Sequence, residues 1–312
     1  MVAVSGGVDS VVLLHLLVQK YVSPVSSLLS PVIGKHTANG RRQETNNKPY
    51  RFVAAHYDHG IREDSHNDRE FVQKIADKYG VPCVFDMGKL GSNASEETAR
   101  DARYKFLNKV KKITAANAII TAHHQDDQIE TIIFNLLRGT GRKGLSSLTD
   151  RKGIIRPLLG VSKKEIITYA NKHNIKWRED PTNTDLKYRR NYIRAKIVSK
   201  ISTEQRKDII AIINKASLTN KKIDDQIAKM LQFIETDKEL DRALFTALPH
   251  KIAAEIVAGW LRSHGIRDFD KRIIERLTTT AKTYPAGKII DINKRYIVKV
   301  TLKSLALQER DR

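Results

Sequence analysis

Short apolar runs alternate with amphipathic helical patterns through the first 200 residues of the chain. The apolar runs are predicted strands, at residues 2–4, 52–57, 81–85, 118–122 and 154–159. The predicted helices lie at residues 10–19, 64–79, 95–114, 126–138 and 162–173, with Gly80 and Gly139 at expected helix ends. This alternation predicts an α/β fold: a parallel five-stranded sheet with helices on both faces.

Two stretches depart from that alternation. Residues 22–50 are rich in Ser, Pro, Asn and Gly and predict a loop insertion. After residue 200, long helical patterns at 203–236 and 242–282 precede a hairpin signal with Asn293 and Lys294 at its turn. We therefore expect one domain over 1–200 and a smaller, mainly helical C-terminal domain with a β-hairpin over 201–312.

The loop Ser5-Gly6-Gly7-Val8-Asp9-Ser10 joins the first predicted strand to the first predicted helix. Backbone N–H groups and the helix dipole at such a junction favour phosphate binding. Asp9 stands where the motif G-x-x-x-x-G-K-[ST] has lysine. A carboxylate beside phosphates requires a cation, and Mg²⁺ takes one or two carboxylates together with phosphate oxygens. Asp9 therefore predicts a Mg²⁺ site, unless it only caps the helix.

Two further motifs follow strand ends or lie on a helix. His56, His59 and Arg62 offer two imidazoles and a guanidinium at the end of the second strand, although a polar turn would look the same. Arg100 and Arg103 are three residues apart and share a helix face, which suits phosphate or carboxylate binding. The alternative is a solvated face paired with neighbouring glutamates 96 and 97.

The segment AHHQDDQIET, residues 122–131, is the most informative. If its helix reaches back to His123, then His123, Asp127 and Glu130 fall on one face. The alternative is a capping box in which Asp127 caps and Glu130 reaches back. A histidine-based metal site lacks a third His or Cys at ligand spacing.

The bulk charge and one helix point to nucleic acid. Lys and Arg number 56 against 35 Asp and Glu, a net charge of +21, which favours a nucleic-acid partner over a merely lysine-rich composition. Residues 187–200 carry six basic side chains and no acid, with Tyr188 and Tyr192 between them. This pattern predicts phosphate contacts with stacking rings, or else a solvated basic face.

Composition excludes several classes of function. Cys83 is the only cysteine, which excludes disulfides, cysteine-based metal sites and two-cysteine sulfur relays. No run of 18 apolar residues predicts a membrane span, and the N-terminus predicts a strand rather than a signal peptide. We expect a cytoplasmic protein with no membrane partner.

The order of the motifs resembles the tRNA(Ile)-lysidine synthetase family. SGG-x-DS, H-x-x-HG-x-R, A-R-x-x-R-Y, A-H-H-x-D-D-Q-x-E-T, R-P-L-L, D-x-x-N and R-N-x-x-R follow one another across about the first 200 residues. SGG-x-DS is shared by all PP-loop ATP pyrophosphatases, whose fold is adenine nucleotide alpha hydrolase-like. The resemblance implies a PP-loop catalytic domain and a tRNA-binding role for residues 201–312.

The resemblance also implies a reaction. The carbonyl oxygen of the wobble cytidine, in the CAU anticodon of tRNA(Ile), attacks the α-phosphate of ATP and releases pyrophosphate. The ε-amino group of free L-lysine then displaces AMP at carbon 2 to give lysidine. A departing pyrophosphate needs charge neutralisation by Mg²⁺ and backbone amides. The resemblance therefore implies that Asp9 in the loop holds this Mg²⁺.

Roles for individual residues follow from the same resemblance. The residues expected to bind ATP are Ser5, Gly6, Gly7, Val8, Asp9, Ser10, His56 and His59. The residues expected to take part in catalysis are Asp9, Arg103 and His123, where His123 orients the reacting groups or accepts a proton. Asp127 and Glu130 are expected to hold the α-ammonium of lysine. The residues expected to bind tRNA are Lys187, Arg189, Arg190, Arg194 and Lys196, and either Arg103 or Arg194 suits the lysine carboxylate or the α-phosphate.

This chain departs from the family pattern in three places. Asp58 stands where Asn is common, and the 22–50 insertion is longer than the usual connection. The chain begins one residue before its first predicted strand, where the family has an N-terminal extension, which leaves the start codon open. Alternative functions are a PP-loop tRNA thiolase and a non-catalytic ATP-dependent RNA-binding protein. The oligomeric state is open, with a homodimer as one candidate.

Overall fold

The computed structural model describes residues 1–21, 52–60, 65–88, 90–91, 94–146, 148, 153–179 and 185–310. The chain divides into two compact units, Met1–Asn214 and Lys215–Arg312. The expected 22–50 insertion and Arg62 lie outside the described residues. The expected domain boundary at residue 200 precedes helix α7 (Thr203–Ile234), whereas the division falls inside this helix.

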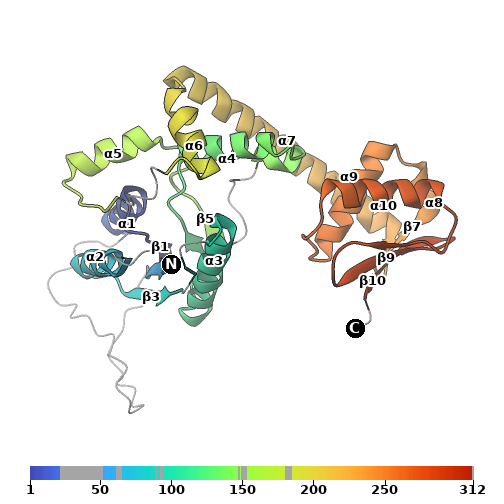
Figure 1. The fold of residues 1–312 in the computed structure, drawn as a ribbon, viewed down its shortest axis with the longest axis horizontal. Helices are drawn as coiled ribbons and strands as arrows, with labels where there is room; N and C mark the ends of the chain where they lie inside the picture. The colour runs from blue at the N-terminus through green and yellow to red at the C-terminus, as the bar shows by residue number, and fades with distance from the viewer. Residues whose placement is uncertain are drawn as a thin grey trace, which may run out of the picture. The chain divides into compact units, whose positions relative to one another are not determined.

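The first unit contains a five-stranded sheet in the order β3-β2-β1-β4-β5, and its paired strands are parallel (Figure 1). The strands are β1 (Val2–Ala3), β2 (Ala54–Asp58), β3 (Cys83–Met87), β4 (Ile119–Ile120) and β5 (Ile154–Ile155). The predicted parallel sheet is confirmed, because each predicted strand is present in this order along the chain.

Helices cover both faces of this sheet, as predicted. They are α1 (Val8–Tyr21), α2 (Ser65–Lys78) and α5 (Lys163–Lys172) on one face and α3 (Glu96–Ile113) on the other. The helices α4 (Gln125–Leu137) and α6 (Arg189–Lys196) pack on each other and on the start of α7 in a separate cluster, with 3₁₀ turns at Arg142–Ser146 and Val198–Lys200. Along β1 the side chains alternate between two hydrophobic clusters. Val2 and Val4 pack with α1, α2 and α5, while Met1 and Ala3 pack with α3. Figure 1 shows α1 and α2 on one side of the sheet and α3 on the other.

Local signals at helix ends are also present. Gly80 and Gly139 have positive φ angles of 61° and 65°, which continue the backbone past α2 and α4 at little steric cost. The start of α5 is a capping box in which Ser162 and Glu165 bond to each other's backbone N–H. This box sets where the first residue of α5, Lys163, lies.

The second unit contains the rest of α7, then α8 (Arg242–Ala247), α9 (His250–Ser263) and α10 (Lys271–Thr283). Its sheet has the order β6-β7-β10-β9-β8 and is antiparallel. The strands are β6 (Glu235–Thr236), β7 (Glu239–Asp241), β8 (Ile289–Asp291), β9 (Tyr296–Val300) and β10 (Ser304–Glu309). The core surrounds the fully buried Trp260 and Phe245.

The predicted hairpin is β8–β9. Its turn is closed by the Asn293 side chain, which accepts hydrogen bonds from the backbone of Arg295 and Tyr296. β10, β7 and β6 extend it into a sheet that the sequence did not predict. β6 and β7 have only two and three residues, too few for an alternation pattern, and three successive residues of β10, Leu305 to Leu307, are buried without alternation. Across the described residues, no helix has the length and apolar character that a bilayer crossing requires.

Candidate active site

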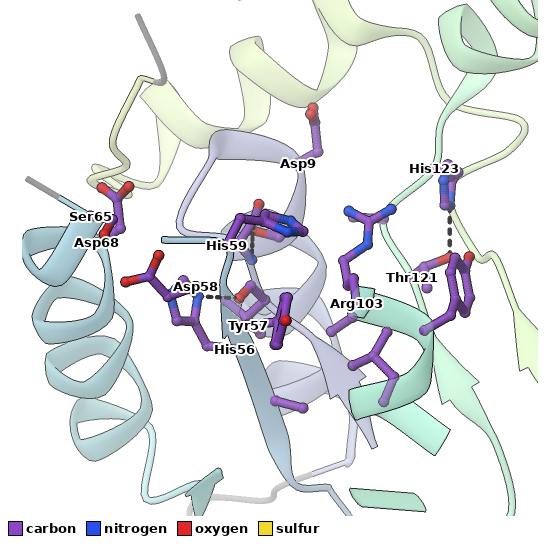
Figure 2. A pocket seen from close by; sticks show the side chains of 18 of the residues that line it. Asp9, His56, Tyr57, Asp58, His59, Ser65, Asp68, Arg103, Thr121 and His123 are labelled. Carbon is purple, nitrogen blue, oxygen red and sulfur yellow. Dashed lines mark hydrogen bonds between the residues drawn. The ribbon is translucent and has the colours of Figure 1, made fainter. Parts of the chain in front are cut away.

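A cavity of about 380 Å³ opens at the carboxyl-terminal ends of β1, β2 and β4 (Figure 2). Ligands bind at this edge of open parallel sheets, and the volume falls within the range of small-molecule sites. The polar residues that line the cavity are Ser5, Asp9, Ser10, His56, Tyr57, Asp58, His59, Ser65, Asp68, Arg103, Tyr104, Thr121, His123 and Asp127.

The opening loop is closed on itself by Ser10. The backbone N–H of Ser5 donates to Ser10 Oγ (3.1 Å), and Ser10 Oγ donates to the carbonyl of Gly7 (2.9 Å). Gly6 has a φ of 94°, a left-handed conformation that favours glycine. Because α1 begins at Val8, the positive end of its dipole lies at this loop. The loop therefore has the form of an anion site before any ligand binds.

Asp9 is the second residue of α1 and does not occupy the cap position. Its carboxylate instead forms an ion pair with Lys163 from the first turn of α5, at 2.7 Å to Oδ1 and 2.8 Å to Oδ2. The alternative of a purely capping aspartate is therefore wrong. The sequence did not predict a role for Lys163, because it lies 154 residues from Asp9 along the chain.

The start of α4 differs from the expected one. The helix begins at Gln125, and His124 is its N-cap with an extended backbone (φ −122°, ψ −175°). His123 is therefore outside the helix, so the expected shared face of His123, Asp127 and Glu130 is wrong. The predicted capping box pairs the wrong residues, because Asp127 Oδ2 accepts from the backbone N–H of His124 (2.9 Å).

His124 is a site residue that the sequence reasoning missed. Its Nε2 lies 3.7 Å from Asp9 Oδ1 and 3.5 Å from Asp127 Oδ2, and its side chain is buried. The imidazole therefore joins the opening loop to the first turn of α4. In the sequence, only the adjacent pair His123-His124 pointed to this residue. The backbone conformation of the N-cap decides which of the two rings faces Asp9.

His123 also faces the cavity, beside the carboxyl end of β4. Its Nδ1 is hydrogen-bonded to Thr121 Oγ1 at 2.8 Å (Figure 2). Burial, and then the positive charges of Arg156 and Arg103, lower the pKa of His123 to about 3. The ring is therefore neutral at physiological pH and fixed in orientation by Thr121.

Arg103 enters the same cavity from α3. Figure 2 shows its guanidinium extending between Asp9 and His123. Burial lowers the pKa of Arg103 below its ordinary value, although the side chain of Tyr104 opposes this. Arg100 lies over the Tyr104 ring at 4.9 Å. Glu96 was an expected partner of Arg100 and Arg103, but it forms its ion pair with Arg190 (3.0 Å).

Glu130 is buried one turn beyond Asp127. Its Oε2 accepts from Arg194 Nη2 at 2.8 Å and from Arg194 Nε at 3.0 Å, and its Oε1 lies 3.9 Å from Arg190 Nη1. Burial raises the pKa of Glu130, and the two arginines oppose that rise. Two of the five basic residues expected to contact tRNA are thus engaged with carboxylates on α3 and α4.

The remaining basic residues of this region are exposed. Lys187, Arg189 and Lys196 lie at the surface of α6 and the turn before it. Tyr188 and Tyr192 are exposed between them, with 45% and 51% of their surface accessible. Cations and aromatic rings therefore share one surface segment, the combination that suits single-stranded nucleic acid.

The end of β2 contributes His56, Asp58 and His59. His56 Nδ1 donates to the carbonyl of Val4 (2.9 Å), and burial lowers the pKa of this imidazole. Asp58 Oδ1 accepts from the backbone N–H of Gly60 (2.8 Å). An asparagine oxygen can accept the same bond, so either residue is able to close this turn.

The donor set near Asp9 fits a Mg²⁺ ion shared with a ligand. Asp9 supplies a single hard carboxylate beside a loop built for phosphate. In the described ranges, no cluster of three or more His, Cys, Asp or Glu could hold a metal by itself. Such an ion would therefore take most of its remaining ligands from phosphate oxygens and water.

Comparisons with known proteins agree with this geometry. The family profile described as the PP-loop domain matches residues 1–201. A protein of Thermotoga maritima named tRNA(Ile)-lysidine synthase is 38% identical over 205 residues, covering 64% of this chain and 44% of that protein. A protein of the same name from Bacteroides thetaiotaomicron is 33% identical over 258 residues, covering 77% of this chain and 54% of that protein.

One solved structure, the U34-tRNA thiolase NcsA from Methanococcus maripaludis with its 4Fe-4S cluster, aligns with a TM-score of 0.49 at 20% identity. The alignment covers 76% of this chain and 73% of that one. The chain spans about half the length of the curated relatives it matches. Since the profile match extends over most of the chain and contains the whole cavity, the chain belongs to the PP-loop domain family.

Proposed function

We propose that this chain is an ATP-dependent ligase that attaches lysine to carbon 2 of the wobble cytidine in the CAU anticodon of tRNA(Ile). One observation carries the proposal. Asp9, Arg103, His123 and Asp127 come from three separate segments, and all four line one cavity. The similarity to proteins named tRNA(Ile)-lysidine synthase supports the same reaction.

ATP is the nucleotide that membership of the PP-loop family supports. In our proposal the triphosphate lies against the loop from Ser5 to Ser10, with His56 and His59 on the side of β2. Asp9 would hold Mg²⁺, which when bound supplies positive charge to the departing pyrophosphate. The backbone N–H groups at the start of α1 supply further stabilisation without reorganisation.

The first step forms one bond and breaks another at the α-phosphorus. The carbonyl oxygen of the cytidine bonds to the α-phosphorus as the bond to the bridging oxygen breaks, and the electron pair leaves with pyrophosphate. We assign the α-phosphate contact to Arg103, because its guanidinium lies in the cavity and its N–H groups can donate two parallel hydrogen bonds to phosphate oxygens.

His123 orients the reacting groups in this proposal. A base with a pKa of about 3 is far too weak to remove a proton from an ammonium group with a reference pKa of about 10.4. Its hydrogen bond to Thr121 fixes which edge of the ring meets the substrate. Of the two roles considered for His123, the orienting role is the one the pKa supports.

Lysine binding is assigned to Asp127 and Glu130, with Arg194. Asp127 lines the cavity, whereas Glu130 and Arg194 form an ion pair outside its lining. Because an amino acid is a zwitterion, in our proposal it exchanges partners with this pair. The α-ammonium would approach the two carboxylates, while the α-carboxylate would approach Arg194. This arrangement leaves the ε-amino group to attack the cytidine once it has lost its proton.

Contact with tRNA is assigned to the exposed residues Lys187, Arg189 and Lys196, with Tyr188 and Tyr192 as stacking rings. The net charge of +21 supports the same class of partner. The proposed reaction takes place in the cytoplasm, where tRNA and ATP are available.

The test measures pyrophosphate release and lysine incorporation with a tRNA(Ile) transcript carrying CAU. We expect pyrophosphate release that requires this tRNA, and radiolabelled lysine transferred to it in equal amount. A transcript with uridine at the wobble position is the matched control and should accept no lysine. Release without lysine transfer would refute the ligase, and no release would favour the non-catalytic alternative.

The thiolase alternative needs a reactive sulfur. Cys83 lies in β3, and burial raises the pKa of its thiol to about 12, so the thiolate is not formed at neutral pH. We expect Cys83→Ala to release pyrophosphate at the parental rate. A variant that folds but has lost activity would return the thiolase to consideration.

A further inference from the structure

The ammonium group of Lys163 is paired with the Asp9 carboxylate, which is the proposed ligand of the metal. Its Nζ lies 2.7 Å and 2.8 Å from the two oxygens of Asp9. The two side chains are 36% and 28% exposed, so the pair lies at the mouth of the site and not within the core. The opening loop lacks a lysine of its own, and this one comes from the other end of the first unit's sequence.

Contacts with the neighbouring helices hold the backbone of Lys163. Ser162 and Glu165 cap the helix that begins with it. The backbone N–H of Lys163 also donates to Asp126 Oδ1 on α4, at 3.4 Å, and Asp126 forms an ion pair with Arg206 at 2.7 Å. The start of α5 is thus linked to α4, while the long side chain of Lys163 has several rotatable bonds through which its ammonium can change position.

The ion pair has a consequence for ligand binding. Both oxygens of Asp9 accept from one ammonium, so a cation that binds Asp9 competes with that ammonium and is repelled by its charge. The displaced side chain keeps its anchor at the start of α5, and it remains within reach of the loop that would hold the phosphates. A cation released beside a triphosphate is attracted to the phosphate oxygens.

We propose that Lys163 is a displaceable counter-ion of Asp9 that moves to the β- and γ-phosphates of ATP when Mg²⁺ binds. This inference rests on the proposed function. In the empty site Lys163 neutralises Asp9. In the loaded site it contacts the part of ATP that leaves as pyrophosphate, which makes it a catalytic residue.

The chemistry of the leaving group gives this contact its value. As the bond between the α-phosphorus and the bridging oxygen breaks, the electron pair stays on pyrophosphate and its negative charge increases. An ammonium that donates hydrogen bonds to these oxygens stabilises the transition state more than the ground state, and no proton needs to move. The charge on Lys163 is therefore required, and not merely the length of its side chain.

The inference predicts two effects of opposite sign from one substitution. Lys163→Gln keeps most of the side chain's length and removes its charge. We expect the Mg²⁺ concentration that gives half-maximal binding of α,β-methylene-ATP to fall about tenfold, because the ammonium of Lys163 no longer competes for Asp9. We expect the rate of pyrophosphate release to fall by about 10- to 100-fold, because the leaving group loses a cation.

Binding of the uncleavable analogue is measured by calorimetry in a series of Mg²⁺ concentrations, on the full chain. Lys164→Ala is the matched control, since Lys164 is the next residue on α5 and is exposed. It should match the parent in both measurements. Lys163→Arg retains a cation, and we expect it to lie within a few-fold of the parent in both measurements.

The Mg²⁺ requirement and the rate of pyrophosphate release of Lys163→Gln together test the inference. A Lys163→Gln variant with an unchanged or higher Mg²⁺ requirement would overturn the inference, as would one that releases pyrophosphate at the parental rate. A merely structural role predicts a lower melting temperature with the parental Mg²⁺ requirement, and this result also overturns it. If the parent itself releases no pyrophosphate, the proposed function fails, whereas the Mg²⁺ competition at Asp9 is still decided by the calorimetry.

Discussion

Removal of Arg194 should destabilise the first unit, and the loss should depend on pH. Glu130 is buried, with only 3% of its side chain exposed, and two of its three charged contacts come from Arg194. Arg194→Ala leaves Arg190, at 3.9 Å, as the remaining cation near Glu130 within the described part of the chain. The expected cost is the loss of a charged hydrogen bond, about 1.5–3 kcal/mol at pH 8. Arg194 is itself 45% exposed, which keeps the cost below that of a fully buried pair.

The pH dependence follows from the sign of the pKa shift. Burial raises the pKa of Glu130 in the folded protein, so the folded state binds this proton more readily than the unfolded chain does. The associated stability is present below the unfolded pKa and is lost as the pH rises through the folded pKa. Loss of Arg194 raises the folded pKa further. The difference in stability between variant and parent should therefore grow from about pH 5 to pH 8.

The loss of unfolding free energy is measured on the full chain by hydrogen exchange in increasing denaturant. The exchange is followed in peptides from α4 and α6. A domain of this size changes its melting temperature by about 2–4 °C per kcal/mol, so thermal melts should show a drop of about 3–12 °C at pH 8. Lys196→Ala, on the same helix and exposed, is the control and should stay near the parent. An Arg194→Ala variant with an equal loss at both pH values would refute the assignment to Glu130.

Three further predictions address the proposed chemistry. Asp9→Asn should keep the fold and lower adenylation by about two to four orders of magnitude, and near-normal turnover at saturating Mg²⁺ would contradict its metal role. Asp127→Asn should weaken lysine binding by about 1.5–3 kcal/mol while ATP and tRNA binding change little; lost ATP binding with unchanged lysine affinity would assign this carboxylate to the metal. Alanine at Lys187, Arg189 and Lys196 together should reduce the slope of log affinity for tRNA against log salt by about 0.7–0.9 per lost contact, and a parental slope would show that they are only solvated.

The sequence by itself determined the features that depend on neighbours along the chain. Alternating apolar runs and helical periods predicted the parallel sheet, because each strand and each helix shows its buried face in its own few residues. The glycines and serines of the opening loop predicted an anion site for the same local reason. The cysteine count leaves no second thiol within these 312 residues for a disulfide or a two-cysteine relay.

The tertiary structure decided which side chains meet. Lys163 pairs with Asp9 across 154 residues, and Arg194 pairs with Glu130 across 64, because crossover connections bring distant helix ends to one edge of the sheet. Helical periodicity cannot show such pairs, since it relates only residues within one helix. The shared face of His123, Asp127 and Glu130 depended on a helix that reached back to His123, whereas α4 begins at Gln125 and the extended backbone at its N-cap brings the His124 ring near Asp9. A difference of one residue in where a helix begins thus changes which imidazole meets the loop, and that start depends on how Asp127 caps the helix against the rest of the fold.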